Sequence, residues 1–146
     1  MKFEQNASFE NMVQYPRTAL MENGLPLKGK WQKEFFKNNQ PIVLELGCGK
    51  GEYTVGLADK FPDKNFIGVD IKGARMWRGA RTATDNMMKN VGFLRTKIEL
   101  IDHCFSKGEI SEIWITFPDP QIKYRRRKKR LTSPSMLDKY RSILSD

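Results

Sequence analysis

Short apolar runs alternate with longer amphipathic segments along most of the chain after residue 40. The apolar runs predict strands at residues 42–46, 66–69, 93–95 and 113–117. The segments between them predict helices at residues 52–60, 73–89 and 98–105. Strands and helices that alternate in this way are typical of a parallel sheet covered on both faces. The pattern therefore predicts an α/β protein with a Rossmann-like, doubly wound parallel sheet of about four strands.

The first 40 residues lack this alternation, because glycine and proline interrupt their apolar positions. Only one short helix is predicted there, over residues 30–37, with Trp31 and a neighbouring phenylalanine buried. We therefore divide the chain into an N-terminal arm with a short helix, residues 1–40, and a single domain, residues 41–146.

The composition is ordinary for one globular domain: 146 residues, of which 39% are hydrophobic and 29% are charged. No apolar run approaches the roughly 18 residues that a membrane-spanning helix needs. The N-terminus has no apolar core of a signal peptide. The two cysteines, Cys48 and Cys104, fit neither a metal-site nor a disulfide pattern. We therefore expect a cytoplasmic, reduced protein with no membrane or metal partner.

The net charge of +9 comes mostly from one segment, the basic run at residues 123–130. Its basic residues are Lys123, Arg125, Arg126, Arg127, Lys128, Lys129 and Arg130. Without these seven, 19 basic residues face 17 acidic ones in the rest of the chain. Such concentration favours a polyanionic partner, above all a nucleic acid, with salt-sensitive binding. A solvated tail is the alternative. We expect the basic run to be disordered without RNA, because its like charges repel one another.

The stretch ELGCGKG, which includes the end of the first predicted strand, places Gly47, Gly49 and Gly51 at alternate positions, with Glu45 two residues before them. Glycines at a strand-to-helix turn allow a ligand to approach the backbone closely. The dinucleotide pattern G-x-G-x-x-G would require glycine where Glu52 stands, which disfavours a nicotinamide cofactor. The carboxylate of Glu45 would repel a pyrophosphate but suits the ammonium and sulfonium groups of S-adenosylmethionine. A tight turn without a ligand is the competing interpretation.

Asp70 ends the second predicted strand, nineteen residues after Gly51. At that place in a doubly wound sheet, a carboxylate can accept hydrogen bonds from both hydroxyl groups of a ribose. A helix N-cap is the alternative role. We interpret Cys48 as a small residue that fills the loop and His103 as a helix-surface residue, because nothing in the sequence pairs them as nucleophile and base.

Asp119 stands between Pro118 and Pro120, directly after the fourth predicted strand. The two prolines fix the backbone on either side of the carboxylate and remove two amide donors. A turn aspartate is common in such sequences. The adjacent basic run, however, indicates that this acid could act on a bound nucleic acid. Basic side chains position nucleic-acid phosphates. A carboxylate beside them can accept hydrogen bonds from the N1–H and amino group of an unstacked guanine.

Three stretches together resemble the bacterial tRNA (guanine-N7)-methyltransferases: LELGCGKG, NFIGVDIKGARMWRGA and FPDPQIKYRRRKKRLT. The resemblance covers about residues 42–140, and the third stretch is its most specific part. It implies a class I methyltransferase fold, with S-adenosylmethionine as cofactor and tRNA as partner. The reaction that it implies is transfer of a methyl group to N7 of a guanine in the variable loop of tRNA.

The resemblance also implies roles for residues at matching positions. The implied cofactor-binding residues are Glu45, Gly47, Gly49, Gly51 and Asp70. Asp119 matches the family's catalytic acid, which also contacts the substrate. Lys123 matches a substrate-binding lysine, and the remainder of the basic run, Arg125 to Arg130, matches the segment that contacts RNA.

Two positions depart from the family's pattern. Gln121 stands where the family often has tryptophan. Lys97 stands where it often has an acid that contacts the adenine side of the cofactor, so Lys97 is assigned to the cofactor by position alone.

The family's chains continue past residue 146, with further strands of a seven-stranded sheet and a Thr-x-x-Glu element that helps to hold the guanine. The strand at residues 113–117 is therefore expected to have an unpaired edge, which is a liability in isolation. We expect a truncated chain, a proteolytic fragment, or a partner on that edge, such as a second copy forming a homodimer. The functional alternatives are a non-catalytic chain that binds cofactor and RNA, and a small-molecule methyltransferase.

Overall fold

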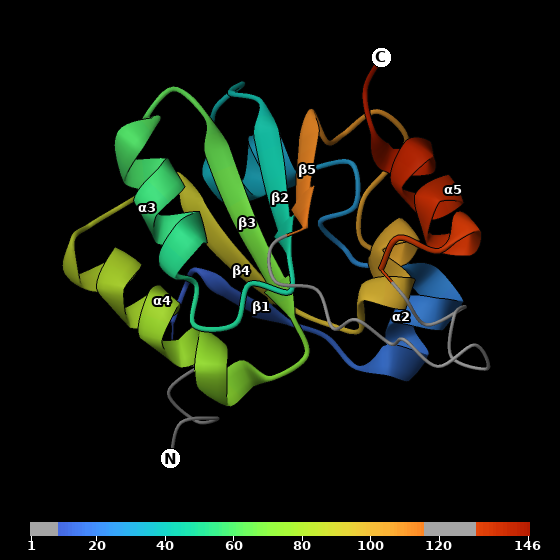
Figure 1. The fold of residues 1–146 in the computed structure, drawn as a ribbon, viewed down its shortest axis with the longest axis horizontal. Coiled ribbons are helices and arrows are strands. Elements are labelled where there is room, and N and C mark those ends of the chain that lie inside the picture. Colours follow the sequence, from blue (N-terminus) through green and yellow to red (C-terminus); the bar gives the residue numbers. More distant parts are fainter. Residues whose placement is uncertain (1–8, 116–130) are drawn as a thin grey trace.

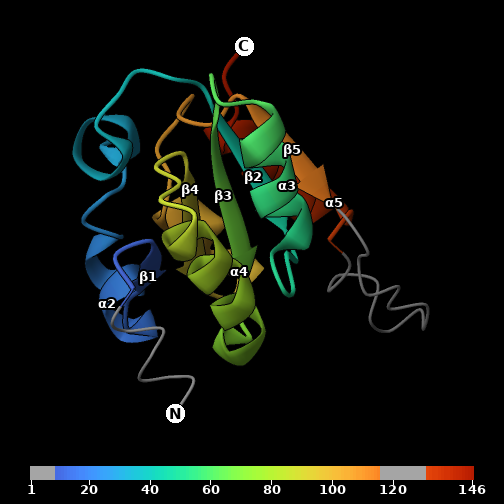
Figure 2. The same cartoon turned by 90° about the vertical axis from the view of Figure 1, so that its left-hand side faces the viewer.

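A five-stranded parallel sheet forms the core of the computed structural model, which describes residues 9–115 and 131–146. The strands lie in the order β1-β4-β3-β2-β5 (Figure 2). Their bounds are β1 Met12–Gln14, β2 Ile42–Leu46, β3 Asn65–Asp70, β4 Val91–Arg95 and β5 Glu112–Ile115. The helices are α2 Arg17–Asn23, η1 Trp31–Phe36, α3 Glu52–Lys60, α4 Gly73–Asp85, η2 Ile98–His103 and α5 Pro134–Ile143.

Helices cover both faces of the sheet (Figure 1). On one face, α3 and α4 pack on the strands through Val43, Ala58, Met76, Ala80 and Phe93. On the other face, α2, η1, η2 and α5 bury Leu20, Trp31, Ile101, Met136 and Tyr140. The predicted doubly wound architecture is therefore confirmed. No helix in the described ranges is long and apolar enough to cross a membrane.

Several elements lie where the sequence predicts them. The strand at residues 42–46 and the helix at residues 52–60 have the predicted bounds. Other elements differ at their ends: β4 begins earlier, α4 ends earlier, and η2 is a shorter 3₁₀ helix. The strand predicted at residues 113–117 corresponds to β5, and its last two predicted residues lie outside the described ranges.

β1, α2 and α5 are not predicted from the sequence, and the described residues contain five strands instead of the four predicted. β1 has three residues, of which only Met12 is buried, so no apolar run marks it. It is defined by its pairing with β4, in which Met12 lies opposite Phe93. The N-terminal arm therefore contributes a strand to the sheet.

β5 forms one edge of the sheet, with Ile115 opposite Leu46 of β2. Just before β5, Ile110 forms a parallel bridge with Leu144, and its N–H donates a hydrogen bond of 3.0 Å to the carbonyl of Ile143. Beyond that bridge, the outer edge of β5 has no partner strand within residues 9–115 and 131–146.

Candidate functional site

The carboxyl ends of the parallel strands meet at one edge of the sheet, where open α/β folds bind their ligands. The glycine turn follows β2 at this edge, and Asp70 ends β3. Lys97 follows β4 by two residues, and Ile115 ends β5. The topology thus brings together the described residues that the sequence analysis selects.

Gly49 and Gly51 of the turn are glycines for different structural reasons. A Cβ atom on Gly51 would lie 2.7 Å from the ring of Phe93 and 3.2 Å from the Cα atom of Gly79, so Gly51 allows α3 to begin close to α4 and β4. A Cβ atom on Gly49 would meet nothing within 4 Å. Both have positive φ, 75° and 55° respectively, which favours glycine. Packing therefore explains Gly51, whereas the open space at Gly49 leaves its backbone accessible to a ligand.

Asp70 holds the glycine turn in place. Its Oδ2 atom accepts a hydrogen bond of 2.9 Å from the N–H of Gly49. Its Oδ1 atom accepts hydrogen bonds from the N–H groups of Ile71, at 2.7 Å, and Lys72, at 3.2 Å. The N-cap residue of α4 is Lys72, which has no side-chain cap, so Asp70 does not act as the N-cap of that helix.

Glu45 is a buried carboxylate, with only 4% of its surface exposed. Its Oε1 atom accepts a hydrogen bond of 2.5 Å from the Thr54 hydroxyl of α3. A buried carboxylate without hydrogen-bond donors would destabilise the fold, and Thr54 supplies one of them. The Glu45 side chain, on the strand before the glycine turn, is therefore held by a hydrogen bond from α3, the helix that follows the turn.

Cys48 lies inside the turn and is buried. Burial raises the pKa of its thiol well above the usual value, and the nearby carboxylates of Asp70 and Glu45 raise it further. A Cβ atom on Gly68 would lie 3.0 Å from the Cys48 sulfur, so the side chain fills the space above β3. The thiol stays protonated near neutral pH, which agrees with its interpretation as a filler and disfavours a nucleophilic role.

An open cavity of about 420 Å³ lies beside Asp70, at the carboxyl ends of β1, β3 and β4. Its lining includes Ile71, Thr96 and Lys97 on one side and Tyr15 and Arg17 of the N-terminal arm on the other. Lys97 is exposed, and Ile71 is 44% exposed although it is apolar. The cavity is therefore a recess with apolar and basic walls. One of its wall residues, Ile71, directly follows Asp70 in the chain.

Arg95 connects the two sides of this cavity. Its Nε atom donates to the carbonyl of Ile71 at 2.9 Å, and its terminal nitrogen donates to the side-chain oxygen of Gln14 at 3.1 Å. Neither Arg95 nor the arm residues that line the cavity are predicted from the sequence as site residues. They come together only because β1 pairs with β4, and the sequence signals no strand there.

Asp119, Lys123 and the rest of the basic run, Arg125 to Arg130, lie outside the described residues. The chain after them is fixed to α5, because the Tyr140 hydroxyl donates a hydrogen bond of 2.5 Å to the carbonyl of Leu131. Burial raises the pKa of Tyr140 to about 12, so this hydroxyl keeps its proton to a higher pH than an exposed tyrosine does. Ser133 caps α5 by accepting a hydrogen bond from the N–H of Met136.

Comparisons with known proteins agree with this geometry. Residues 39–146 match a family model described as "Putative methyltransferase". The chain is 62% identical to the tRNA (guanine-N(7)-)-methyltransferase of Christiangramia forsetii and 59% identical to that of Bacteroides fragilis, in each case over 98% of this chain. It spans 64% and 56% of the lengths of these two relatives.

Solved structures show the same fold at low sequence identity. An antibiotic-related methyltransferase matches with a TM-score of 0.66 and 17% identity, covering 83% of this chain and 61% of its own. A 30S ribosomal A1408 methyltransferase from an uncultured bacterium matches with a TM-score of 0.60 and 16% identity, covering 75% and 52%. PKMT2 from Rickettsia typhi, in complex with AdoHcy, matches with a TM-score of 0.56 and 22% identity, covering 76% and 21%.

Proposed function

The chain belongs to the methyltransferase family whose model it matches over residues 39–146, and from this membership we propose that it methylates N7 of a guanine in the variable loop of tRNA. The observation that carries the proposal is the 62% identity to a tRNA (guanine-N(7)-)-methyltransferase over 143 residues. The basic run supports it, because seven cations in eight residues fit an RNA backbone better than a small metabolite. An enzyme that acts on tRNA also fits the predicted cytoplasmic location.

The described residues fit S-adenosylmethionine as cofactor. The open space at Gly49 and the buried acid Glu45 would suit its charged methionine end, and we assign Asp70, at the end of β3, to its ribose hydroxyls. The cavity beside Ile71, Thr96 and Lys97 would hold its adenine. When bound, this cofactor supplies an electrophilic methyl group on a sulfonium.

Asp119 is proposed to orient the guanine. N7 carries a lone pair and has no proton to lose, so correct placement matters more than a strong base. The carboxylate would accept hydrogen bonds from the guanine N1–H and amino group, and it would stabilise the positive charge that the methylated ring gains. β5 ends at Ile115, beside Leu46 and the start of the glycine turn, and Asp119 follows four residues later. This spacing supports its place near the cofactor.

The basic run is proposed to bind phosphates around the target guanine, with Lys123 closest to the substrate. Such contacts hold an RNA in position without reading its bases. In this proposal, the domain at residues 41–146 supplies the cofactor and RNA sites, and the arm at residues 1–40 adds β1 and one wall of the cavity.

A non-catalytic chain that binds cofactor and tRNA is the second candidate. Residues 1–146 contain both proposed binding elements, the cofactor site and the basic run, and they span 64% and 56% of the lengths of the two relatives described above. In this candidate, cofactor and tRNA bind to residues 1–146 without methyl transfer.

Transfer of labelled methyl groups to tRNA tests the proposal and its alternative together. The substrate is unmodified bacterial tRNA, and the matched control is the same tRNA transcribed with 7-deazaguanosine, which lacks N7. We expect label at one variable-loop guanine of the first tRNA and none in the second. Binding of tRNA and S-adenosylhomocysteine without transfer would favour the non-catalytic candidate. Equal labelling of both tRNAs would contradict N7 as the target.

A further inference from the structure

α4 presents arginines along its exposed side. Arg75, Arg78 and Arg81 follow one another at three-residue intervals, and all three are exposed. The opposite side of the helix faces the sheet and buries Gly73, Met76, Gly79, Ala80 and Ala83. Packing therefore explains the small residues of α4 and leaves the arginines unexplained. We call Arg75, Arg78 and Arg81 the arginine face.

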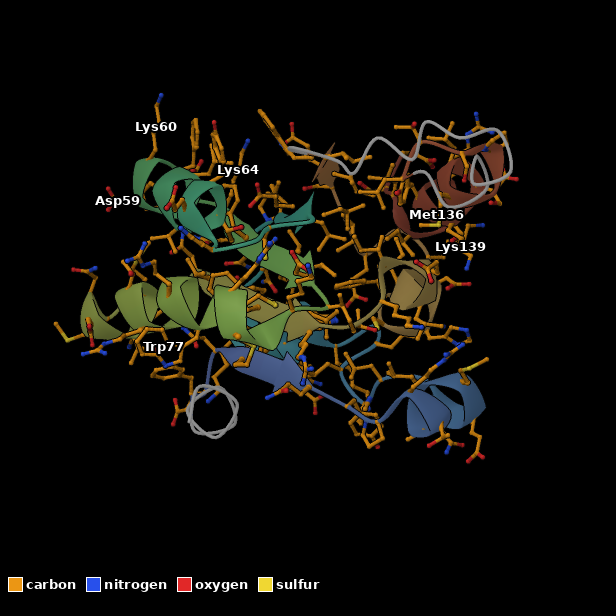
Figure 3. The ribbon with its side chains drawn as sticks, turned by 60° about the horizontal axis from the view of Figure 1, so that its bottom comes forward. Asp59, Lys60, Lys64, Trp77, Met136 and Lys139 are labelled. Carbon is orange, nitrogen blue, oxygen red and sulfur yellow. The ribbon has the colours of Figure 1, made fainter. Side chains whose placement is uncertain are left out.

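The arginine face is poorly balanced by acids. Within residues 9–115 and 131–146, neither Arg75 nor Arg78 forms an ion pair. Only Arg81 has a carboxylate partner, Asp85, at 3.6 Å. It also lies 5.2 Å from the ring of Trp77, which projects from the side of α4 away from α3 (Figure 3).

Helix α5 differs from α4 because its basic side chains have carboxylate partners. Its Arg141 lies 3.7 Å from Asp138 of the same helix, and Lys139 lies 4.0 Å from Asp102 of η2. A solvated helix surface usually mixes both signs in this way, as α5 does. Arg75 and Arg78, one turn apart and without an ion pair in the part of the chain that the structure describes, instead create local positive potential that is available to an external anion.

The arginine face and helix α5 lie on opposite flanks of the molecule (Figure 1). α4 begins three residues after Asp70, and Arg75 and Arg81 are about 9 Å apart along the helix axis. The basic run joins β5 to α5, and α4 and α5 cover opposite faces of the sheet (Figure 1). A polyanion that reached over the carboxyl edge from β5 would therefore meet a second positive surface on α4.

We propose that the arginine face of α4 binds backbone phosphates of the tRNA, as a second RNA-binding surface in addition to the basic run. This inference rests on the proposed function and deepens it. Arginine suits the role because its planar guanidinium can form two parallel hydrogen bonds to one phosphate. Phosphate contacts on two flanks of the cofactor edge fix the orientation of the RNA, whereas contacts on one flank leave it free to pivot.

The test compares two doubly substituted chains that lose the same charge. One is Arg75→Gln/Arg78→Gln, and the matched control is Lys33→Gln/Lys60→Gln, on η1 and α3, where both lysines are exposed. Glutamine keeps a helix propensity close to that of arginine and lysine, so thermal unfolding should be unchanged in both. A third variant, Arg75→Lys/Arg78→Lys, keeps the positive charge. The dissociation constant for tRNA is measured at several NaCl concentrations.

We expect Arg75→Gln/Arg78→Gln to bind tRNA about tenfold more weakly at moderate salt, with the slope of log affinity against log salt reduced by about 2. The lysine control should change the slope by much less, and Arg75→Lys/Arg78→Lys should retain most of it. If the glutamine variant matched the parent in affinity and slope, the inference would be overturned.

Methyl transfer measured on the same samples separates this inference from the proposed function. A parent chain that binds tRNA without methylating it contradicts the proposed reaction, while the salt slopes still decide whether α4 binds RNA. A parent chain that does not bind tRNA at any salt concentration overturns both.

Discussion

The Oδ2 atom of Asp70 lies 2.9 Å from the backbone nitrogen of Gly49, so the carboxylate at the end of β3 holds the turn that follows β2. The same carboxylate accepts two further backbone N–H groups through Oδ1. It therefore joins two neighbouring strand ends at the edge where a cofactor would lie. This gives Asp70 a structural role in the turn as well as the proposed role toward the ribose.

Asp70→Asn should weaken the binding of S-adenosylhomocysteine by at least tenfold. The substitution removes the charge that strengthens hydrogen bonds from the ribose hydroxyls, each worth about 1.5–3 kcal/mol. It also places an amide where Oδ2 or Oδ1 now accepts backbone donors. Isothermal titration calorimetry would measure the change, with Asp63→Asn, at an exposed position, as the control. Equal affinities for the two variants would contradict the ribose assignment.

Gly51→Ala and Gly49→Ala should separate folding from binding. Alanine at Gly51 would overlap the Phe93 ring at positive φ, so we expect a loss of about 2–4 kcal/mol in the free energy of unfolding. Alanine at Gly49 meets no neighbour and carries only the conformational cost, about 1–2 kcal/mol. It should nevertheless lower cofactor affinity, because the methyl group enters the open space. Urea unfolding and calorimetry check both, and a stability order opposite to this one would be inconsistent with the packing.

The two cysteines should resist alkylation in the folded protein. Burial raises the pKa of Cys104 to about 12, from a usual value near 9, and the nearby carboxylate of Asp102 adds to this increase. At pH 9 the thiolate fraction should therefore be several hundredfold lower than in the unfolded chain. The pKa of Cys48 is raised as well, first by burial. Mass spectrometry after iodoacetamide treatment, with and without urea, checks this. Rapid modification of Cys48 in the native protein would show an accessible, reactive thiol.

The same pKa shift has a consequence for stability. The folded pKa of Cys104 lies above its unfolded value, so the unfolded chain loses the proton first as pH rises. The contribution of Cys104 to the free energy of unfolding is therefore complete below about pH 9 and is lost progressively between pH 9 and pH 12.

Continuous apolar runs made the centre of the sheet predictable. All five residues of β2 are buried, and Pro41 and the glycine turn mark its two ends. β1 could not be predicted, because two of its three residues are only half-buried and its strand conformation depends on β4. α5 did have a readable signal, since Ser133 and Pro134 are favoured at the N-cap and first helical positions.

The candidate site divides in the same way. Glu45, the glycines and Asp70 could be predicted, because each lies at a strand end that an apolar run identifies. The arm's side of the cavity could not, because Tyr15 and Arg17 reach it only through the pairing of β1 with β4. Arg75 and Arg78 are obvious in the sequence, but only the burial pattern of α4 shows that they share its exposed side.

Asp119→Asn should reduce the rate of methyl transfer by about a hundredfold or more and leave cofactor affinity within about twofold. Asparagine keeps the size of the side chain but loses the charge, and its amide cannot accept from the guanine N1–H and amino group together. The loss should appear in kcat, because charge stabilisation acts on the transferring state. Single-turnover assays with saturating tRNA measure this step directly.

Asp63→Asn is again the matched control, because it removes one exposed carboxylate far along the chain from β5. Calorimetry with S-adenosylhomocysteine and tRNA binding at fixed salt show whether the two ligands still bind to Asp119→Asn. Retained binding with lost transfer supports the role in orienting guanine. Loss of cofactor binding would place Asp119 in the cofactor site instead. Turnover equal to that of the parent would remove Asp119 from the mechanism and leave the basic run as a binding element only.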